Sequence, residues 1–445
     1  MRASALKYAV LSVLSIICMV VLALAPFHAF LTVWLSSLID GHYIALRLWK
    51  ETLLLVGIIV ASYLVLADHK IRSHTLTRRL VWLILIYIAL NGALGLIAYH
   101  QQEVTLKAAT YGFVINTRFL FFFLVVWAVA LRTSRLQKRW IPLVLYPAAV
   151  VCIFGVLQVF VLPKDFLSHF GYNLTTIDPY GTINNNQNYI RIISTLRGAN
   201  PLGTYLLIPI SVLIVLIIRG KRNWQNISLL IAALITLYFS FSRGAWLGMA
   251  LSFAIILLLN LHSQKAKLTF AGIFCAAILL VASGAIILKD NTHFQNVFLH
   301  TQTNSASPIS SNDNHIAALE NGFENIKIEP LGGGTGSAGP ASVYNERPIR
   351  IAENYYIQLG QEVGIVGVAL FVLINLGVGY LLWLRRSDPL ALSLLVSLIG
   401  ISFINMLSHA WTDDTVAYLW WGLAGIAMVN VSLSAKKSET VKSTK

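Results

Sequence analysis

The chain is divided into about a dozen apolar runs, most of them long enough to cross a lipid bilayer. A spanning helix needs about 20 mostly apolar residues, and a helix satisfies its own backbone hydrogen bonds inside lipid. A chain that is 57% hydrophobic and 11% charged is far too apolar for a soluble fold. We therefore predict an all-α polytopic membrane protein, a single membrane domain over residues 1–445 with about 12 transmembrane helices. The predicted spans are 8–36 (broken near Pro26), 51–67, 80–98, 108–131, 140–162, 201–218, 225–241, 244–261, 268–288, 354–384, 389–410 and 416–434. Residues 8–25 also resemble a signal peptide, but Pro26 disfavours cleavage there, and we expect this run to stay as the first span.

The basic residues predict the orientation of these spans. If the N-terminus is cytoplasmic, the short cytoplasmic connectors hold most of the 33 lysines and arginines and few of the 18 acidic residues. Basic residues are enriched in cytoplasmic loops of membrane proteins, so we predict that both termini are cytoplasmic. The net charge of +15 then reports membrane topology, and we expect membrane lipids and no nucleic acid as partners.

Two connectors on the opposite side of the membrane are long, at residues 163–200 and 289–352. Functional residues concentrate in loops that a rigid scaffold positions. We predict these two extracytoplasmic loops as the place where the protein does its chemistry.

The end of the first loop carries two arginines. Asn200 and Pro201 read as the N-cap and first residue of a membrane helix. Arg197 lies just before this start and Arg191 six residues earlier. Arginine at a membrane edge commonly serves as an anchor, which is the alternative to ligand binding for both.

A third arginine, Arg243, lies in the very short connector "FSFSRGAWLGM" at the start of the next helix. A cation at a helix N-terminus opposes the helix dipole, which favours an anionic ligand between them. The alternative is an ion pair with an outer carboxylate such as Glu353.

Carboxylates follow the second loop. Glu353 is predicted in the first turn of span 354–384, where an acid suits the helix dipole; alternatively it is a general base. Arg350 is close enough in sequence to keep it ionised. Glu362 lies deeper, where a carboxylate usually faces a cavity or a partner. The preceding glycine run "PLGGGTGSAG" is either a phosphate nest or a flexible hinge.

Other catalytic signatures are missing from the sequence. It contains no HExxH motif, no Ser-His-Asp order and no Cys/His cluster. His409, Asp413 and Asp414 lie close together, but their spacing is not diagnostic of a cation site, and we expect a solvated turn. The sequence indicates no metal site and no cofactor.

Three motifs together resemble the O-antigen ligase and O-antigen polymerase superfamily of bacterial membrane glycosyltransferases. "TLRGANPLG" resembles the family's arginine before a membrane helix, and "SRGAWLG" resembles its second arginine motif. "ENYYIQLGQEVGIVG" is similar to the family pattern of His, Asn/Ser/Gln, nine residues and spaced glycines, with Asn354, Gly364 and Gly367 in place. Glu353 takes the position of the histidine.

This resemblance implies a class C glycosyltransferase-like fold in the cytoplasmic (inner) membrane, with an extracytoplasmic active site. It implies metal-independent transfer of a glycan from a lipid-linked oligosaccharide donor, an undecaprenyl diphosphate, to the hydroxyl of a glycan or glycolipid acceptor. Arg197 and Arg243 would bind the diphosphate and Glu353 would take the acceptor's proton, with Arg191, Arg350 and Asn354 in support. The glutamate leaves ligation and polymerisation both open.

A transporter of small anions or of lipid-linked sugars is the alternative function. Transporters normally carry polar residues at mid-membrane depth, often in broken helices. The sequence offers few such residues: Glu362, Asn91, Gln158 and Asn375. The enzyme hypothesis further predicts that the outer ends of spans 201–218, 244–261 and 354–384 converge.

Overall fold

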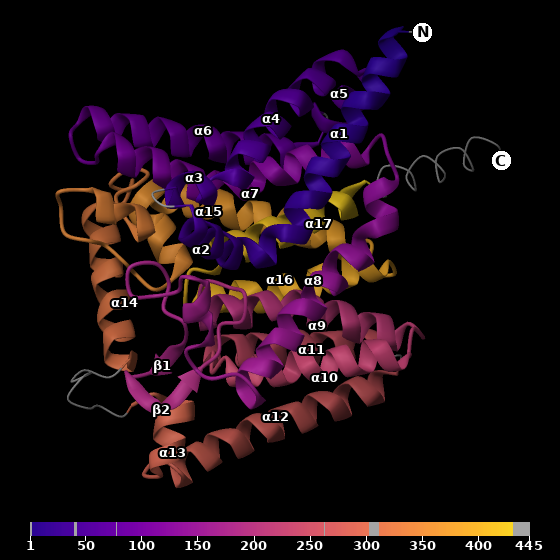
Figure 1. Ribbon diagram of the computed structural model, residues 1–445. Coiled ribbons are helices and arrows are strands. Elements are labelled where there is room, and N and C mark those ends of the chain that lie inside the picture. The colour runs from indigo at the N-terminus through magenta and orange to yellow at the C-terminus, as the bar shows by residue number, and fades with distance from the viewer. Residues whose placement is uncertain (1, 40–41, 77, 262, 302–310, 430–445) are drawn as a thin grey trace.

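The computed structural model describes residues 2–39, 42–76, 78–261, 263–301 and 311–429 as a bundle of helices with one small β-hairpin (Figure 1). The first half contains α1 (Arg2–Leu24), α2 (His28–Leu38), α3 (Tyr43–Arg47), α4 (Trp49–Ala67), α5 (His69–Leu76), α6 (Arg79–His100), α7 (Leu106–Ala130), α8 (Arg135–Phe160), β1 (Gly181–Ile183), β2 (Asn186–Arg191) and α9 (Ala199–Ile218). The second half contains α10 (Trp224–Phe239), α11 (Arg243–Asn260), α12 (Gln264–Ile287), α13 (Thr292–Phe294), α14 (Ser311–Ile328), α15 (Tyr355–Trp383), α16 (Pro389–Asn405) and α17 (Asp414–Met428). Short helical turns are η1 (Ala25–Phe27), η2 (Phe166–Phe170), η3 (Gln295–Leu299), η4 (Gly339–Tyr344) and η5 (Ala410–Thr412).

A helix lies at the place of each of the twelve predicted spans. Among the described residues, eight helical segments are long and apolar enough to cross a membrane, and α10 and α16 are shorter apolar helices. The chain is therefore a polytopic membrane protein with several transmembrane helices. Figure 1 shows α14, β1 and β2 gathered at one end of the long helices, opposite the beginning of α1.

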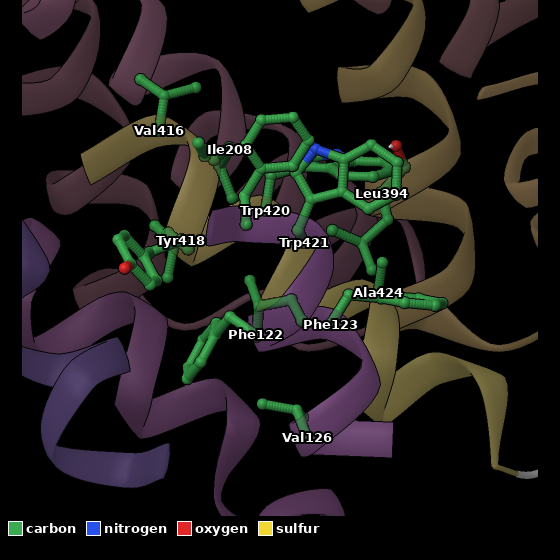
Figure 2. Close-up of a cluster of buried hydrophobic side chains, with 14 of the residues drawn as sticks. Phe122, Phe123, Val126, Ile208, Leu394, Val416, Tyr418, Trp420, Trp421 and Ala424 are labelled. Atoms are coloured by element: carbon green, nitrogen blue, oxygen red, sulfur yellow. Dashed lines mark hydrogen bonds between the residues drawn. The ribbon is translucent and has the colours of Figure 1, made fainter. Parts of the chain in front are cut away.

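The core of the bundle lies around α17. Every residue of α17 is buried, and this helix packs along α7 and also contacts α9, α16 and α1. Aromatic rings fill the contact (Figure 2): Trp421 packs against Phe123 at 5.8 Å between ring centres, and Tyr418 packs against Phe122 at 5.2 Å. The backbones approach closely at Gly425, where an added Cβ would lie 2.8 Å from the Phe123 carbonyl oxygen. Small residues permit such close packing between membrane helices.

The predicted break near Pro26 is present as η1, which separates α1 from α2. A proline removes a backbone donor and interrupts the helix. Two carbonyl groups at the break accept hydrogen bonds from distant threonines: Thr195 donates to the Pro26 carbonyl at 2.8 Å, and Thr415 donates to the Ala25 carbonyl at 2.9 Å. The break thus ties the first span to α17 and to the segment before α9.

A β-hairpin within the first long loop carries Arg191. Strands β1 and β2 pair antiparallel, with Gly181 opposite Arg191. Asn184 and Asn185 between them have φ angles of 49° and 58°, and paired positive φ values at two asparagines suit a tight hairpin turn. Arg191 therefore lies at the end of the hairpin that faces the start of α9.

The start of α9 differs from the prediction. The N-cap is Gly198 and the helix begins at Ala199, so Asn200 is already inside the first turn and does not cap it. Its side chain instead accepts a hydrogen bond from Arg191. The prediction of Asn200 as N-cap and Pro201 as first helical residue is wrong by two positions.

Most of the glycine run 330–339 is packed among the helices, although Leu331 near its start is 73% exposed. The hydroxyl of Thr335 is fully buried and donates to the Asn91 carbonyl in α6 at 2.8 Å. Gly336 packs against α7, where an added Cβ would lie 2.4 Å from the Ala108 carbonyl oxygen. The Gly333 N–H donates to the Gln361 carbonyl of α15 at 2.8 Å. The expectation of a flexible hinge is therefore wrong, because each turn of this segment is held by a neighbouring helix.

Glu362 holds this glycine segment in place. Its carboxylate accepts the Gly336 N–H at 2.8 Å and the Asn116 side-chain amide at 2.9 Å. Two residues later, Gly364 adopts φ 66° and kinks α15, and the backbone of Leu331 lies against it. Glu362 was expected to face a cavity or a partner, and its partner is the glycine segment 330–339 of the same chain.

Candidate functional site

Arg197 lies in the segment that enters α9 and is held by Asp413. The Arg197 Nε donates to the Asp413 carboxylate at 2.7 Å, and the arginine side chain remains 42% exposed while the aspartate is buried. Asp413 also accepts the Val416 N–H at 3.1 Å as the N-cap of α17. Burial by itself would lower the pKa of Arg197, but the nearby carboxylates of Asp413 and Asp414 raise that pKa above its ordinary value. Arg197 is thus a fixed cation with a face open to solvent.

A cavity of about 250 Å³ opens beside Arg197. The start of α9 and the connector between α16 and α17 line it: Arg197, Gly198, Asn200, Pro201, Thr204, Ser408, His409, Ala410 and Asp413. No side chain caps the first turn of α9. A helix N-terminus presents unpaired N–H groups and a partial positive charge, and together with an arginine it is suited to a phosphate or diphosphate.

Arg191 borders this cavity through Asn200. Its Nη2 donates to the Asn200 carboxamide oxygen at 2.5 Å, and its Nε donates to the Ser240 carbonyl at 2.9 Å. Burial and then repulsion from Arg243 lower the pKa of Arg191 to about 10. The two guanidinium groups therefore lie close enough to repel each other, a costly arrangement that an anion between them would relieve.

Arg243 begins α11 and faces the second long loop. It donates to the Leu299 carbonyl at 2.6 Å and to the Asn312 side chain at 2.9 Å. The Leu299 carbonyl ends η3, and a cation at the C-terminal end of a helical turn is favourable. Within the described part of the chain no carboxylate pairs with Arg243, so the ion-pair alternative, Glu353 included, is wrong.

Glu353 lies just before α15, whose N-cap is Asn354. The expectation that it occupies the first helical turn is therefore wrong. Its backbone has φ 51°, which is unusual and strained for a residue with a side chain. The carboxylate contacts Nδ1 of His315 in α14. This hydrogen bond lowers the pKa of Glu353. Burial opposes the shift, and the charges of His315 and His409 add to it.

The two remaining predicted residues have separate places. Arg350 donates to both oxygens of Glu329, at 2.7 and 3.3 Å, and lines a second, much smaller cavity. His315, and not Arg350, is the partner of Glu353. The Asn354 side-chain oxygen caps α15 by accepting the N–H groups of Tyr356 and Ile357 at 2.9 and 3.1 Å. Its side-chain amide donates to the Met406 carbonyl at 2.8 Å.

One hydrogen bond and the charges that act on His409 link the start of α15 to the large cavity. The Tyr355 N–H donates to the carbonyl of Ser408, which lines the large cavity, so the start of α15 adjoins the cavity wall. Burial and then repulsion from Arg197 lower the pKa of His409 to about 4, although Glu353 opposes this shift. His409 is therefore neutral at pH 7 and lies within the electrostatic reach of both Arg197 and Glu353. Of the six predicted residues, Arg197 alone lines the cavity, among the ranges that the structure describes.

The carboxylates after His409 are not in a solvated turn. Asp413 and Asp414 are 3% and 8% exposed, so that expectation is wrong. Across residues 2–39, 42–76, 78–261, 263–301 and 311–429, no three His, Cys, Asp or Glu side chains are placed to share a metal ion.

A buried group of charges next to Asp413 was missed from the sequence. Lys50 is 1% exposed and contacts Asp414 at 2.8 Å, while Arg118 contacts Glu51 at 3.1 Å. The ring of His28 lies 3.0 Å from the Lys50 ammonium. We call Lys50, Glu51, Arg118, Asp414 and His28 the buried charge cluster. The available signal was Arg118 in the middle of an apolar run, because an intramembrane arginine requires a partner.

His315 was also missed, because it is 38 residues from Glu353 in sequence and follows no motif.

Residues 227–372 match a family model described as O-antigen ligase. No curated protein matches the chain. The matched segment begins in α10 and ends within α15, and it includes Arg243, Glu353 and Asn354 but not Arg197. The match indicates a glycosyltransferase-like ligase or polymerase that acts in polysaccharide biosynthesis on a lipid-linked glycan donor and a glycan acceptor. Residues 227–372 are thus similar to the O-antigen ligase family that the sequence motifs also resemble.

Proposed function

We propose that this protein transfers a glycan from an undecaprenyl-diphosphate carrier to an acceptor hydroxyl, without a metal, at the outer face of the cytoplasmic membrane. The observation that carries the proposal is the cavity of about 250 Å³ that combines the exposed face of Arg197 with the uncapped N-terminus of α9. Both features stabilise phosphate oxygens. No nucleotide is needed, because the energy for transfer is already stored in the diphosphate–sugar bond.

The proposed orientation places both termini in the cytoplasm and the cavity outside. Support comes from the distribution of basic residues along the chain. The basic connectors predicted to be cytoplasmic also contact one another or nearby helix ends: Arg132 binds Asp68, Arg219 donates to the Arg386 carbonyl, and Arg385 donates to the Ala427 carbonyl. The loops 163–200 and 289–352 then lie together at the extracytoplasmic end.

The diphosphate is assigned to the arginines. Arg197 would bind the diphosphate at the N-terminus of α9, and Arg243 and Arg191 would form the second cationic group. As the sugar–diphosphate bond breaks, negative charge grows on the leaving oxygen, and arginines held in advance stabilise it. Arg243 is already positioned by the Leu299 carbonyl and Asn312, which reduces the cost of ordering it when the donor binds.

The acceptor is assigned to the side of Glu353. Its carboxylate promotes removal of the proton from the attacking hydroxyl, and Asn354 supports it by fixing the start of α15 against the 406–408 segment. The same arrangement serves ligation of a finished glycan to a glycolipid and polymerisation of repeat units, because both reactions join an acceptor hydroxyl to the same kind of donor.

A purified-protein assay with a lipid-diphosphate donor tests this proposal. We expect Arg197→Ala and Arg243→Ala each to lower kcat/KM by roughly 100- to 1,000-fold, the usual effect of removing one preorganised group that stabilises developing charge. Arg347→Ala is the matched control, because Arg347 contacts Glu103 beside the second cavity. Its activity should equal that of the parent protein.

Full activity in both the Arg197 and Arg243 variants would remove the proposed site. Flux of donor across a proteoliposome membrane with no change in glycan linkage would support a transporter instead. In cells, glycan analysis of a deletion strain separates the two enzymatic forms: shortened chains indicate a polymerase, and unattached chains indicate a ligase.

A further inference from the structure

α14 presents a histidine to the predicted acceptor side of the site. Nδ1 of His315 contacts the Glu353 carboxylate. The two side chains are 39% and 37% exposed, so solvent and a substrate can reach both. Among the described residues, the second ring nitrogen, Nε2, has no hydrogen-bond partner. A carboxylate that binds one nitrogen of an imidazole selects the tautomer and leaves the other nitrogen able to accept a proton.

The docking of α14 explains why this contact is stable. His315, Gly322 and Ile326 lie at intervals of seven and four residues, which places them on one face of a helix. An added Cβ at Gly322 would lie 2.5 Å from the Ile357 side chain, and one at Gly360 would lie 2.5 Å from the Ile326 side chain. Two close contacts therefore hold this face of α14 against the start of α15, with His315 next to Glu353.

The groups around His315 give it the surroundings of an active site. The charges of Arg243 and Arg191 act on His300, and the charge of Arg197 acts on His409. Burial and the charges of Arg243 and Arg191, with a contribution from His315, lower the pKa of His300 to about 3. His300 and His409 are thus both neutral at pH 7. His315 is the histidine of this group that is paired with a carboxylate.

We propose that Nε2 of His315 is the atom that takes the proton from the acceptor hydroxyl, and that Glu353 is a positioning residue that orients the ring. This inference rests on the proposed glycan transfer and deepens it. A carboxylate whose pKa is lowered is a weak base at neutral pH, whereas an imidazole is the side chain best matched to proton transfer near pH 7.

The step balances in atoms and electrons. The acceptor oxygen forms a bond to the anomeric carbon of the donor sugar, and the bond from that carbon to the diphosphate oxygen breaks. The electron pair of the broken bond leaves with the lipid diphosphate, which the arginines hold. The acceptor's proton goes to Nε2 of His315, and the resulting imidazolium is paired with the Glu353 carboxylate until water removes the proton.

The experiment compares His315→Ala with Glu353→Gln in the purified full chain, with a lipid-diphosphate donor and a sugar acceptor. We expect His315→Ala to lower kcat roughly 100-fold or more, as removal of a general base does, with donor KM unchanged. Added imidazole should restore part of the rate only in this variant. Glu353→Gln should lower kcat less and keep the acid limb of the pH profile. In His315→Ala that limb should be lost.

His169→Ala is the matched control, because His169 lies in η2, where its ring contacts the carbonyl and the ring of Phe166; its profile should equal that of the parent. Wild-type kcat and pH profile in His315→Ala would overturn the inference. So would an acid limb that Glu353→Gln abolishes and His315→Ala keeps, because Glu353 would then be the base. If Arg197→Ala and Arg243→Ala also keep full activity, the proposed function itself fails; if only the His315 variant does, this inference alone fails.

Discussion

At the scale of single residues, Asp413 has two tasks that the sequence does not join. It caps α17 and it holds Arg197 in the wall of the cavity, across a separation of 216 residues. The motif that carries Arg197 predicts an arginine at a helix start, and this was sufficient to identify a candidate ligand for phosphate. That Asp413 is the carboxylate partner of Arg197 was not predictable, because a pairing over so many residues depends on how α9 and α17 pack.

Asparagine and alanine at position 413 should separate these two tasks. Asparagine is also a good N-cap, so Asp413→Asn should keep thermal stability while it releases Arg197 and lowers kcat about tenfold. Asp413→Ala should show the same loss of kcat and a further loss of about 1 kcal/mol in stability from the missing cap. Steady-state kinetics and thermal unfolding of both variants provide the measurement. Equal activity of Asp413→Asn and the parent protein would show that Arg197 does not need its partner.

At the scale of structural elements, the glycine segment 330–339 departs most from its expected character. The sequence indicates many glycines in an outer loop, which commonly means flexibility. The structure has Gly332, Gly334, Gly336 and Gly339 at φ angles from 64° to 95°, a region that residues with side chains rarely adopt. The sequence did contain a relevant signal in Glu362, since a carboxylate so deep in an apolar helix needed donors. It could not show that the donor is a glycine N–H.

Gly336→Ala should therefore be strongly destabilising. The new Cβ would meet the Ala108 carbonyl carbon and oxygen at 2.5 and 2.4 Å, at a φ of 95°. We expect a loss on the order of 3 kcal/mol from strain and displaced packing, measured by thermal unfolding followed through tryptophan fluorescence. Gly272→Ala is the control, because nothing lies within 4 Å of its added Cβ in α12 and alanine favours a helix. Equal stability of the two variants would contradict the packing described for Gly336.

At the scale of the whole molecule, apolar runs were sufficient to place the helices, since each run contains a helix in the described part of the chain; residues 430–434 of the last predicted span lie outside that part. The apolar runs were not sufficient to predict how the helices pack against one another. Nothing in the hydropathy of α17 distinguishes it from α12, yet α17 is buried along its whole length, whereas α12 is largely exposed at one edge of the bundle (Figure 1). The order of packing depends on specific contacts such as Gly425 against Phe123 and on the buried charge cluster beside α17.

The buried charge cluster should contribute to stability as a unit. Removing one partner of a buried ion pair leaves an uncompensated charge and commonly costs about 3–5 kcal/mol. We expect Lys50→Met to show a loss of this size, and Lys50→Met with Asp414→Asn to recover part of it. Thermal unfolding of the single and double variants measures the coupling. Lys327→Met is the control, because its pair with Glu324 is exposed and should contribute little. A Lys50→Met variant as stable as this control would show that the cluster does not support the fold.

The burial of the glycine segment also means that the packing of α6 and α7 is completed late in synthesis. α6 and α7 enter the membrane more than 200 residues before Thr335 and Glu362 exist. In that interval the Asn91 carbonyl lacks Thr335 and the Asn116 amide lacks Glu362, although the Asn116 amide can already donate to the Asn91 side-chain oxygen at 3.3 Å. When α15 is inserted, Glu362 binds Asn116 and the segment 330–339 closes over both helices. The last third of the chain therefore completes the packing of the first, and the nascent protein acquires its finished form only after α15 has left the ribosome.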